Sequence, residues 1–273
     1  MRLPFQKGAP KAGLRHPATA LSPDMPSVKV AALYRAARVG GDFFDFATVG
    51  SSRLLLLLLD IAGERTQALH IAAAVQDVFR GGTDLMLHED VNEAVALPHL
   101  LLDINHAIMT AAGGVRHSPA FLGCFNEELG TFSYVNAGHT PALLRDQSGI
   151  TVLSASGLPL GLFSHATHDA QISVLSPNSA LLLVSRGLEE AKSGGEEFGL
   201  ERVQQVLERS AASTPQELCG EVLEAVRLFV ESAPKRLLSL GKRQPISEND
   251  AFGANDATVL ALLRRSTAMA AGA

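Results

Sequence analysis

The chain has 273 residues, of which 47% are hydrophobic and 19% are charged. A chain of this size and composition buries enough apolar surface for one large core, so we expect a single domain. The formal net charge is −5, and the sequence contains two Tyr and no Trp. Neither a basic surface nor a set of aromatic stacking residues is evident, which excludes nucleic acid as an expected partner.

The start of the chain and its apolar runs bear on its location. Residues 1–27 are rich in Pro, Gly and Ala without regular patterning, so we expect a flexible N-terminal arm. The arm lacks an apolar run of signal-peptide length, and the leucine run at 54–59 is too short to cross a bilayer. Cys124 and Cys219 lack ligand spacing, which is typical of buried, inert cysteines in a reducing compartment. We expect a soluble, cytoplasmic protein without a membrane partner.

The folded domain is expected at 28–264, followed by a disordered tail at 265–273. Within the domain, 28–37 predicts a strand, the turn-rich segment 39–46 predicts a loop, and the leucine run at 54–59 predicts a buried strand. A strand that is apolar at every position must be covered on both faces.

Two helices are predicted after this strand. The first spans 66–80, where apolar residues recur at helical spacing. The second begins at Pro98, because proline suits the first position of a helix, and it runs to residue 111. The inward residues of the first helix are Ala68, Leu69, Ile71, Ala72, Val75 and Phe79.

The rest of the chain is predicted to contain more strands and one late helix. Residues 119–126 and 131–138 form a hairpin signal around a turn that ends in glycine. Thr214 and Pro215 are an N-cap and a first helical residue, and they begin a helix that runs to residue 230. The remaining predicted strands are 141–146, 150–155, 170–175, 180–185 and 258–265. This order predicts sheets flanked by helices, in a layered α/β or α+β domain.

Five short motifs follow one another along the chain. They are Val39-Gly40-Gly41-Asp42-Phe43-Phe44-Asp45, Leu59-Asp60-Ile61-Ala62-Gly63, Asn136-Ala137-Gly138-His139-Thr140-Pro141, Gly157-Leu158-Pro159-Leu160-Gly161 and Asn255-Asp256-Ala257-Thr258-Val259-Leu260. In this order the chain resembles the SpoIIE/RsbU branch of the PPM (protein phosphatase 2C-like) family of serine/threonine phosphatases, over residues of about 28 to 264. The resemblance implies a β-sandwich flanked by helices, with a pair of Mn²⁺ or Mg²⁺ ions held at one end.

The resemblance also implies which residues hold metal. Asp42 and Asp60 match metal-binding aspartates, and the backbone carbonyl of Ile61 matches the adjacent main-chain ligand. Hard divalent ions take oxygen ligands, and two close ions share a hydroxide that attacks a phosphate ester without a protein nucleophile. The alternative for both aspartates is an ordinary turn or strand-end role. Weaker candidates for site roles are Asp45, His70, His106 and His139, of which we expect His139 to fix a loop by hydrogen bonds.

Two positions depart from the family pattern. Arg186 stands where the family has the aspartate of a Thr-Asp-Gly motif, and Asn255 replaces the first aspartate of Asp-Asp-x-Thr. The local charge changes by +2 and by +1 respectively. A guanidinium about 5 Å from a divalent ion repels it by roughly 6 to 7 kcal/mol at an effective dielectric constant of about 20. We expect the ions to bind weakly, or one ion to bind instead of two.

Arg186 is open to three interpretations. Its guanidinium occupies the metal position and pairs with Asp42 and Asp60; or it turns outward and binds a phosphoryl group; or it is a solvated residue of a misaligned loop. A nearby carboxylate, Asp256 or Asp250, is a possible substitute for the lost ligand, with Glu248 also in that loop.

Three functions remain open at this stage. The leading hypothesis is a catalytically impaired PPM-fold regulatory protein that binds a signalling partner or a phosphoprotein, such as an anti-sigma-factor antagonist of a bacterial stress response. The alternative is an active phosphatase on such an antagonist, with Mn²⁺ or Mg²⁺ as cofactor, whereas the impaired protein needs none. The third is a purely structural interaction module. Regulatory input is expected from another chain or from a homodimer, or else to be absent.

Overall fold

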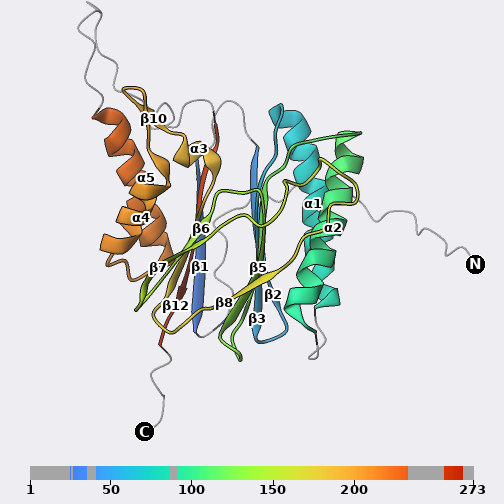
Figure 1. Ribbon diagram of the computed structural model, residues 1–273, viewed down its shortest axis with the longest axis horizontal. Coiled ribbons are helices and arrows are strands. Elements are labelled where there is room, and N and C mark those ends of the chain that lie inside the picture. Colours follow the sequence, from blue (N-terminus) through green and yellow to red (C-terminus); the bar gives the residue numbers. More distant parts are fainter. Residues whose placement is uncertain (1–24, 26, 36–40, 87–90, 233–254, 267–273) are drawn as a thin grey trace, which may run out of the picture.

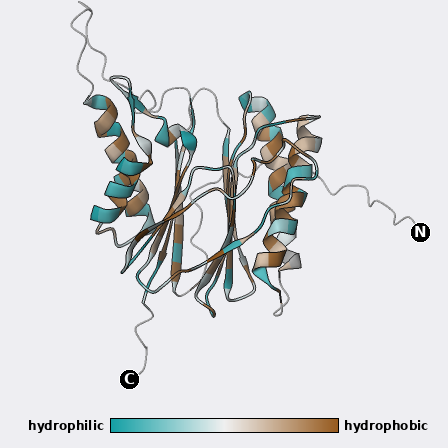
Figure 2. Ribbon diagram, in the orientation of Figure 1, coloured by the Kyte–Doolittle hydropathy of each residue, from teal (hydrophilic) through white to brown (hydrophobic). Residues whose placement is uncertain are grey.

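The computed structural model describes residues 25, 27–35, 41–86, 91–232 and 255–266. Two five-stranded sheets lie face to face, and helices cover the outer face of each sheet (Figure 1). The predicted layered fold of strands and helices is confirmed. Hydrophobic residues line the sheets and the helix faces that contact them, whereas hydrophilic residues lie on the outer faces (Figure 2).

The first sheet has the strand order β1-β12-β9-β6-β7, and all neighbouring strands are antiparallel. Its strands are β1 (Val28–Arg35), β6 (Ala142–Asp146), β7 (Gly149–Leu153), β9 (Ala180–Val184) and β12 (Ala257–Arg264). The last described strand, β12, is therefore the second strand of this sheet, between β1 and β9.

The second sheet has the order β2-β3-β4-β5-β8, again with antiparallel neighbours. Its strands are β2 (Asp42–Val49), β3 (Arg53–Asp60), β4 (Ala120–Asn126), β5 (Thr131–Ala137) and β8 (Gln171–Val174). The prediction of a loop at 39–46 was wrong for its described part. Residues from Asp42 onward form a strand, because Phe43 and Phe44 are buried on opposite faces of the sheet.

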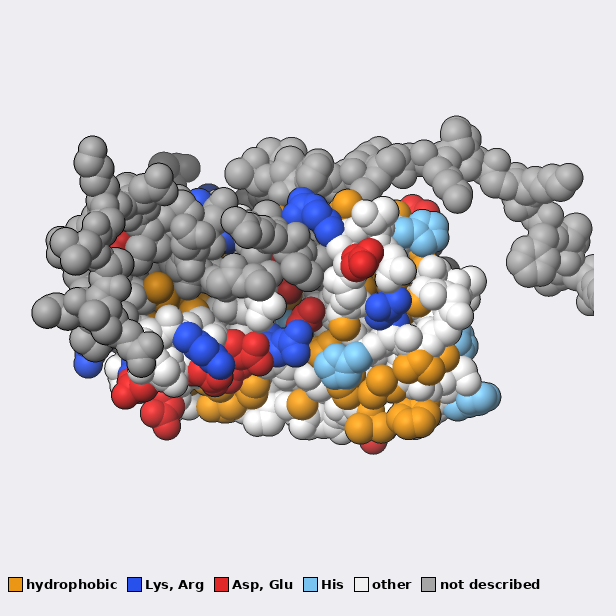
Figure 3. Space-filling view, turned by 90° about the horizontal axis from the view of Figure 1, so that it is seen from above, with side chains coloured by type: hydrophobic (Ala, Val, Ile, Leu, Met, Phe, Trp, Pro, Cys, Tyr) orange, Lys and Arg blue, Asp and Glu red, His pale blue; other side chains and the backbone are white. Residues whose placement is uncertain are grey.

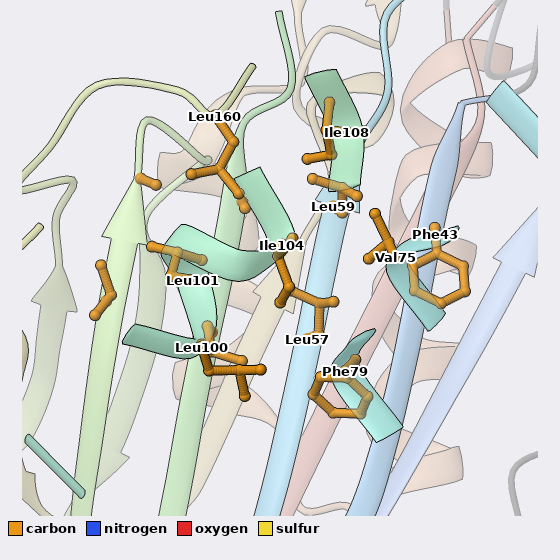
Figure 4. Close-up of a cluster of buried hydrophobic side chains, with 14 of the residues drawn as sticks. Phe43, Leu57, Leu59, Val75, Phe79, Leu100, Leu101, Ile104, Ile108 and Leu160 are labelled. Atoms are coloured by element: carbon orange, nitrogen blue, oxygen red, sulfur yellow. The ribbon is translucent and has the colours of Figure 1, made fainter. Parts of the chain in front are cut away.

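The leucines of β3 explain why this strand is central. Leu54, Leu56 and Leu58 are buried between the two sheets. The alternate leucines, among them Leu57 and Leu59, are buried under the helices, as Figure 4 shows. The prediction that this strand is covered on both faces is confirmed. Removing one such leucine side chain costs about 2 to 5 kcal/mol of stability.

Helices α1 (Arg65–Leu85) and α2 (Glu93–Ala112) cover the second sheet. Both are longer than predicted, and the predicted start of α2 at Pro98 was wrong. The Asn92 side chain caps the helix by accepting a hydrogen bond from the backbone N–H of Ala94 at 3.0 Å, so Pro98 lies inside the helix. Leu69 of α1, predicted to face inward, is 42% exposed.

Helix α2 is long and apolar enough to meet the composition criterion for a membrane-spanning segment. Leu97, Leu101, Ile104 and Ile108 are fully buried in the same cluster as the leucines of β3. Helices in the core of a soluble domain meet the same criterion, so the length and composition of α2 are only weak evidence for a membrane-spanning segment.

Among the described residues, the helices on the first sheet are α3 (Arg186–Glu189), α4 (Gly199–Arg209) and α5 (Pro215–Glu231). The cap predicted for α5 is confirmed. The Thr214 side chain accepts a hydrogen bond from the backbone N–H of Glu217, and the Glu217 side chain accepts one from the backbone N–H of Thr214. Helix α4 was not predicted, since it buries only a narrow stripe that includes Val203 and Leu207. A short hairpin, β10 (Lys192–Ser193) and β11 (Glu196–Glu197), connects α3 to α4.

The described ends of the chain contact each other. Met25 and Ser27, at the end of the predicted arm, are buried, and the carbonyl of Ser27 accepts a 2.7 Å hydrogen bond from the N–H of Arg265. Most of the predicted arm and of the predicted tail at 265–273 lies outside the described residues, as does the loop before Asn255.

A buried polar network attaches α2 to the second sheet at the end opposite Asp60. Arg53 Nε lies 2.7 Å from Glu93 Oε1, which also accepts a 2.7 Å hydrogen bond from Asn126 Nδ2. Burial alone would raise the pKa of Glu93, but the hydrogen bonds from Arg53 and Asn126 outweigh it and lower that pKa. The Glu93 carboxylate therefore depends on Arg53 to remain charged in the interior.

We predict that Arg53→Met destabilises the domain by about 3 to 5 kcal/mol, because it leaves the Glu93 charge buried without its cation. The double variant Arg53→Met, Glu93→Leu recovers part of this loss, since both charges are then absent. Urea unfolding measures both variants. If the single and the double variant lose the same stability, the charge of Glu93 is not the cause.

The two cysteines yield a second prediction. Cys124 and Cys219 are fully buried and free, and burial raises the pKa of each thiol to about 12. Since the thiolate is the reactive form, a thiol reagent at pH 8 leaves the native protein unmodified and modifies two thiols in denaturant. Absorbance of the released chromophore measures the count. Rapid labelling of the native protein would contradict the burial of these side chains.

Candidate functional site

Four strand ends meet at one edge of the sandwich, at the top of Figure 1. Asp42 begins β2 and Asp60 ends β3, and the two are direct partners in the antiparallel register. Residues paired in this way project onto the same face with Cβ atoms about 4.5 to 5.5 Å apart. In the first sheet, β9 ends and β12 begins at the same edge, because Val184 is paired with Val259. The two sheets therefore bring their polar strand ends together here.

Asp42 is bound by the first sheet. Thr258 of β12, fully buried, donates its hydroxyl hydrogen to Asp42 Oδ2 over 2.6 Å. Burial raises the pKa of Asp42 to about 8; hydrogen bonds from Ser185 and Thr258 oppose this rise, and the nearby carboxylates of Asp60 and Asp256 add to it. In the absence of a cation, Asp42 is therefore mostly protonated at neutral pH.

Asp256 is occupied by two donors. The hydroxyl of Tyr34 and the backbone N–H of Gly41 both donate to Asp256 Oδ2, the latter over 3.0 Å. Burial, with the hydrogen bond to Asp256 as the next cause, raises the pKa of Tyr34, so its hydroxyl remains a donor. Gly41 also contacts the loop after β3, where a Cβ at this position would lie 2.3 Å from the carbonyl oxygen of Ile61. Only glycine allows this approach.

Arg186 lies at the start of α3 and reaches across to the second sheet. Its Nη2 is 3.2 Å from Asp60 Oδ2, with side-chain exposures of 48% for Arg186 and 13% for Asp60. The next residue, Gly187, contacts the start of β12: a Cβ there would lie 2.0 Å from the carbonyl oxygen of Asp256. The glycine thus lets α3 approach closely enough for Arg186 to reach the strand end.

The other residues predicted for the site are placed as follows. Asn255 is exposed, and its Nδ2 donates to Glu190 Oε2 over 3.4 Å. Asp250 and Glu248 lie outside the described residues. Asp45 is not in the site, since it accepts hydrogen bonds from Gln76 and Arg80 of α1.

The two weaker histidine candidates also lie away from the strand ends. His70 is exposed on α1. His106 is exposed on α2, and its Nε2 lies 2.9 Å from the carbonyl oxygen of Ser164. Neither histidine lines the cavities beside Asp60.

Arg186 and Asp60 lie between two cavities. The inner cavity is about 70 Å³ and is lined by Gly41, Asp42, Asp60, Ile61, Ala62, Gly63, Arg186, Gly187, Asn255 and Asp256. The outer cavity is about 330 Å³ and is lined by Asp60, Pro119, Gly138, His139, Thr140, Arg186, Glu189, Glu190 and Glu197. Acidic and basic side chains lie next to one another on this end of the molecule, as Figure 3 shows.

His139 fixes its loop as predicted and also has a ring nitrogen without a partner in the described part of the chain. Its backbone N–H donates to Asn136 Oδ1 over 2.8 Å, and its Nδ1 lies 3.0 Å from the carbonyl oxygen of Thr140, so the residue does fix the loop. Its Nε2, however, is buried without a hydrogen-bond partner among the described residues. Burial lowers the pKa of His139, which keeps the ring neutral. The Asn-Ala-Gly-His motif predicted that His139 fixes the loop, but it did not predict that Nε2 lacks a hydrogen-bond partner within the described structure.

The donor atoms do not fit a centre of two metal ions. Asp42, Asp60 and the Ile61 carbonyl are close together, but Asp60 Oδ2 pairs with Arg186 and Asp42 Oδ2 accepts from Thr258. In the part of the chain that the structure describes, no group of three or more His, Cys, Asp or Glu side chains is arranged to hold a metal ion. Mg²⁺ takes six oxygen ligands, of which several are usually waters and one or two are protein carboxylates. Here Asp60 Oδ2 and Asp42 Oδ2 already have partners within the protein.

The two packed sheets with paired helices, and the aspartates at their strand ends, define the PPM class of serine/threonine phosphatase folds. Within this class, the chain belongs to the SpoIIE family: residues 50–235 match the family described as Stage II sporulation protein E (SpoIIE). A curated relative is Protein IcfG of Synechocystis sp., which is 24% identical over 207 residues, or 68% of this chain. The chain spans about a third of the length of that relative, 33%.

Solved structures show the same fold. The RsbU and RsbW domains of Rv1364c from Mycobacterium tuberculosis align with a TM-score of 0.64 and 21% identity, over 88% of this chain and 61% of that one. The SiaA phosphatase domain of Pseudomonas aeruginosa aligns with a TM-score of 0.66 and 16% identity, over 86% and 85%. The catalytic domain of the phosphatase PstP, solved with two manganese ions, has a TM-score of 0.60 and 13% identity, over 88% and 99%. At these identities the likeness concerns the fold.

We predict that Asp42→Asn changes how stability depends on pH. The folded protein keeps a proton on Asp42 up to about pH 8, whereas the unfolded chain releases it near pH 4. Between these values the folded state binds more protons, so the free energy of unfolding falls as pH rises, by at most about 1.4 kcal/mol per pH unit. Asn does not titrate, so the variant lacks this decline.

Urea unfolding between pH 5 and pH 8, with a chelator present, measures the effect. Asp169→Asn is the matched control, because Asp169 is exposed and lines neither of the two cavities. An identical pH slope for wild type and Asp42→Asn would show that Asp42 titrates at an ordinary carboxyl pKa.

Proposed function

We propose that this domain is a regulatory protein of the PPM fold that has lost metal-dependent catalysis and acts by binding a signalling partner in the cytoplasm. The observation that carries the proposal is the 3.2 Å ion pair between Arg186 Nη2 and Asp60 Oδ2. It puts a protein cation on a carboxylate that, by family resemblance, belongs to a metal ion.

The carboxyl groups at the strand ends each have partners within the protein. Asp60 has the guanidinium of Arg186, Asp42 retains a proton because its pKa is raised to about 8, and Asp256 accepts from Tyr34 and Gly41. A divalent ion would have to displace Arg186 and remove the proton from Asp42. Displacing Arg186 costs free energy that a site with Asp at position 186 would not spend, because that site would contain no cation to displace.

The partner we propose is a protein of a signalling pathway, such as an anti-sigma-factor antagonist. Arg186 is 48% exposed and lines both cavities, so its guanidinium is within reach of a phosphoryl group on a phosphoprotein. The glutamates of the outer cavity oppose an anion there, so the surroundings favour partner binding in which a phosphate is not the main anchor.

A second candidate function is an active phosphatase. The observation that favours it is that Asp42, Asp60 and the Ile61 carbonyl remain together at the inner cavity. Asp256 also lines this cavity, although its Oδ2 is already bound by two donors.

Calorimetry with Mn²⁺ separates the two candidates. We predict no saturable binding to the wild-type protein at ion concentrations up to about 1 mM, and a gain of at least about 100-fold in affinity for the double variant Arg186→Asp, Asn255→Asp, since a repelling cation is exchanged for two ligands. The control variant is Lys29→Asp, a charge reversal at an exposed position of β1. It should bind no Mn²⁺.

A parallel assay follows hydrolysis of a generic aryl phosphate with and without Mn²⁺. The proposal expects no Mn²⁺-stimulated activity of the wild-type protein. Mn²⁺-dependent hydrolysis that disappears in Asp60→Asn would establish the active phosphatase instead.

A further inference from the structure

The outer cavity has more negative than positive charge. Asp60 is paired with Arg186, and Glu197 is paired with Lys192 over 3.2 Å at the exposed hairpin. Glu189 and Glu190 also line the cavity. Two carboxylates therefore remain after the two ion pairs are subtracted from the four acidic residues of its lining.

These two carboxylates have neutral partners among the described residues. Thr140 Oγ1 donates to Glu189 Oε2 over 3.1 Å, and Asn255 Nδ2 donates to Glu190 Oε2 over 3.4 Å. Each hydrogen bond occupies one oxygen of a group that can accept several. The cavity thus has spare acceptors as well as spare negative charge.

His139 adds a further acceptor and is the independent sign of a ligand. A carbonyl oxygen only accepts hydrogen bonds, so the contact with Thr140 requires a hydrogen on Nδ1 of His139. In a neutral ring, Nε2 then carries a lone pair on the other side of the imidazole. Nε2 is buried and has no hydrogen-bond partner among the described residues, and the His139 residue, 4% exposed, is part of the lining of the outer cavity. A buried acceptor left unpaired costs about 1 to 3 kcal/mol, which a donor from a ligand would offset.

We propose that the outer cavity binds the guanidinium group of an arginine side chain from the partner protein, with Glu189, Glu190 and His139 as its acceptors. The proposal rests on the proposed function, in which the domain acts by binding a protein, and it names the chemistry of the contact. Guanidinium presents five N–H donors in a fixed plane, which suits acceptors spread over several residues better than one ammonium does. Arg186 does not prevent this, because Asp60 already neutralises it.

The volume of the cavity agrees with this occupant. About 330 Å³ is at the lower end of the range of ligand pockets in proteins and is enough for an arginine side chain. An anion of similar size, such as a phosphoryl group, would face the two surplus carboxylates.

The test is an NMR titration of the full chain with Nα-acetyl-arginine amide, at low salt and with a chelator so that metal ions play no part. We expect saturable shifts of the ring nitrogens of His139 and of the amide of Thr140. The double variant Glu189→Gln, Glu190→Gln should bind at least about fivefold more weakly, because both surplus charges are gone. Glu208→Gln, at an exposed position of α4, is the matched control and should bind like wild type.

Three results would overturn the proposal. They are no shift at His139, equal shifts with the uncharged Nα-acetyl-citrulline amide, and unchanged affinity in the Glu189→Gln, Glu190→Gln variant. His139→Phe tests the acceptor separately and should also weaken binding, and an unchanged affinity would remove His139 from the site.

Agmatine distinguishes a free small cation from a protein side chain. If agmatine binds more tightly than a tripeptide with arginine at its centre, the ligand is a small molecule and the protein partner is wrong. Because no metal takes part, the outcome is independent of the Mn²⁺ calorimetry. If the protein binds both arginine and Mn²⁺ tightly, the proposed function is wrong and the cavity proposal stands. If it binds neither arginine nor Mn²⁺, the cavity proposal is wrong and the proposed function stands.

Discussion

The antiparallel register of β2 and β3 holds Asp42 and Asp60 side by side. Most of the ion pairs and hydrogen bonds at this end of the domain involve these two carboxyl groups or their neighbours. Two full negative charges about 5 Å apart repel by roughly 3 kcal/mol at an effective dielectric constant of about 20. Here the repulsion is relieved in two ways. Arg186 pairs with Asp60, and burial raises the pKa of Asp42 to about 8, so that it keeps a proton.

The same contacts also join the two sheets. Thr258 and Asp256, at the start of β12, bind Asp42 and Gly41 of the second sheet, and Arg186 after β9 binds Asp60. In relatives that hold metal ions, such as PstP with its two manganese ions, ions are part of the structure. In this chain a guanidinium and a set of hydrogen bonds link the strand ends. Glycines at 41 and 187 allow the backbones to approach closely enough for these links.

Much of this could be predicted from the sequence, and the exceptions have physical reasons. The leucine run at 54–59 predicted a strand buried on both faces, and five motifs in a fixed order indicated the family. The prediction of a loop at 39–46 was wrong. Its glycines indicated a turn, whereas the burial of Phe43 and Phe44 on opposite faces of the sheet is typical of a strand. The start of α2 was misplaced because the capping residue is Asn92, and the rule for proline at a first turn pointed to Pro98 instead.

The site shows the same division. That Arg186 stands near the strand-end aspartates followed from its motif, but a linear pattern does not say which carboxylate a long side chain reaches. The structure gives it Asp60, while Asp42 is bound by Thr258, a residue 216 positions away in sequence. The free Nε2 of His139 was also beyond sequence reasoning, since it depends on which ring nitrogen meets the Thr140 carbonyl.

We propose that the Arg186 guanidinium stands where the family holds a metal ion. A crystal structure of the protein grown with Mn²⁺, with anomalous data collected at the manganese edge, tests it most directly. We predict Arg186 within hydrogen-bonding distance of Asp60 and no anomalous peak beside Asp42 and Asp60. A strong peak bound by these two aspartates, with Arg186 turned away, would contradict it.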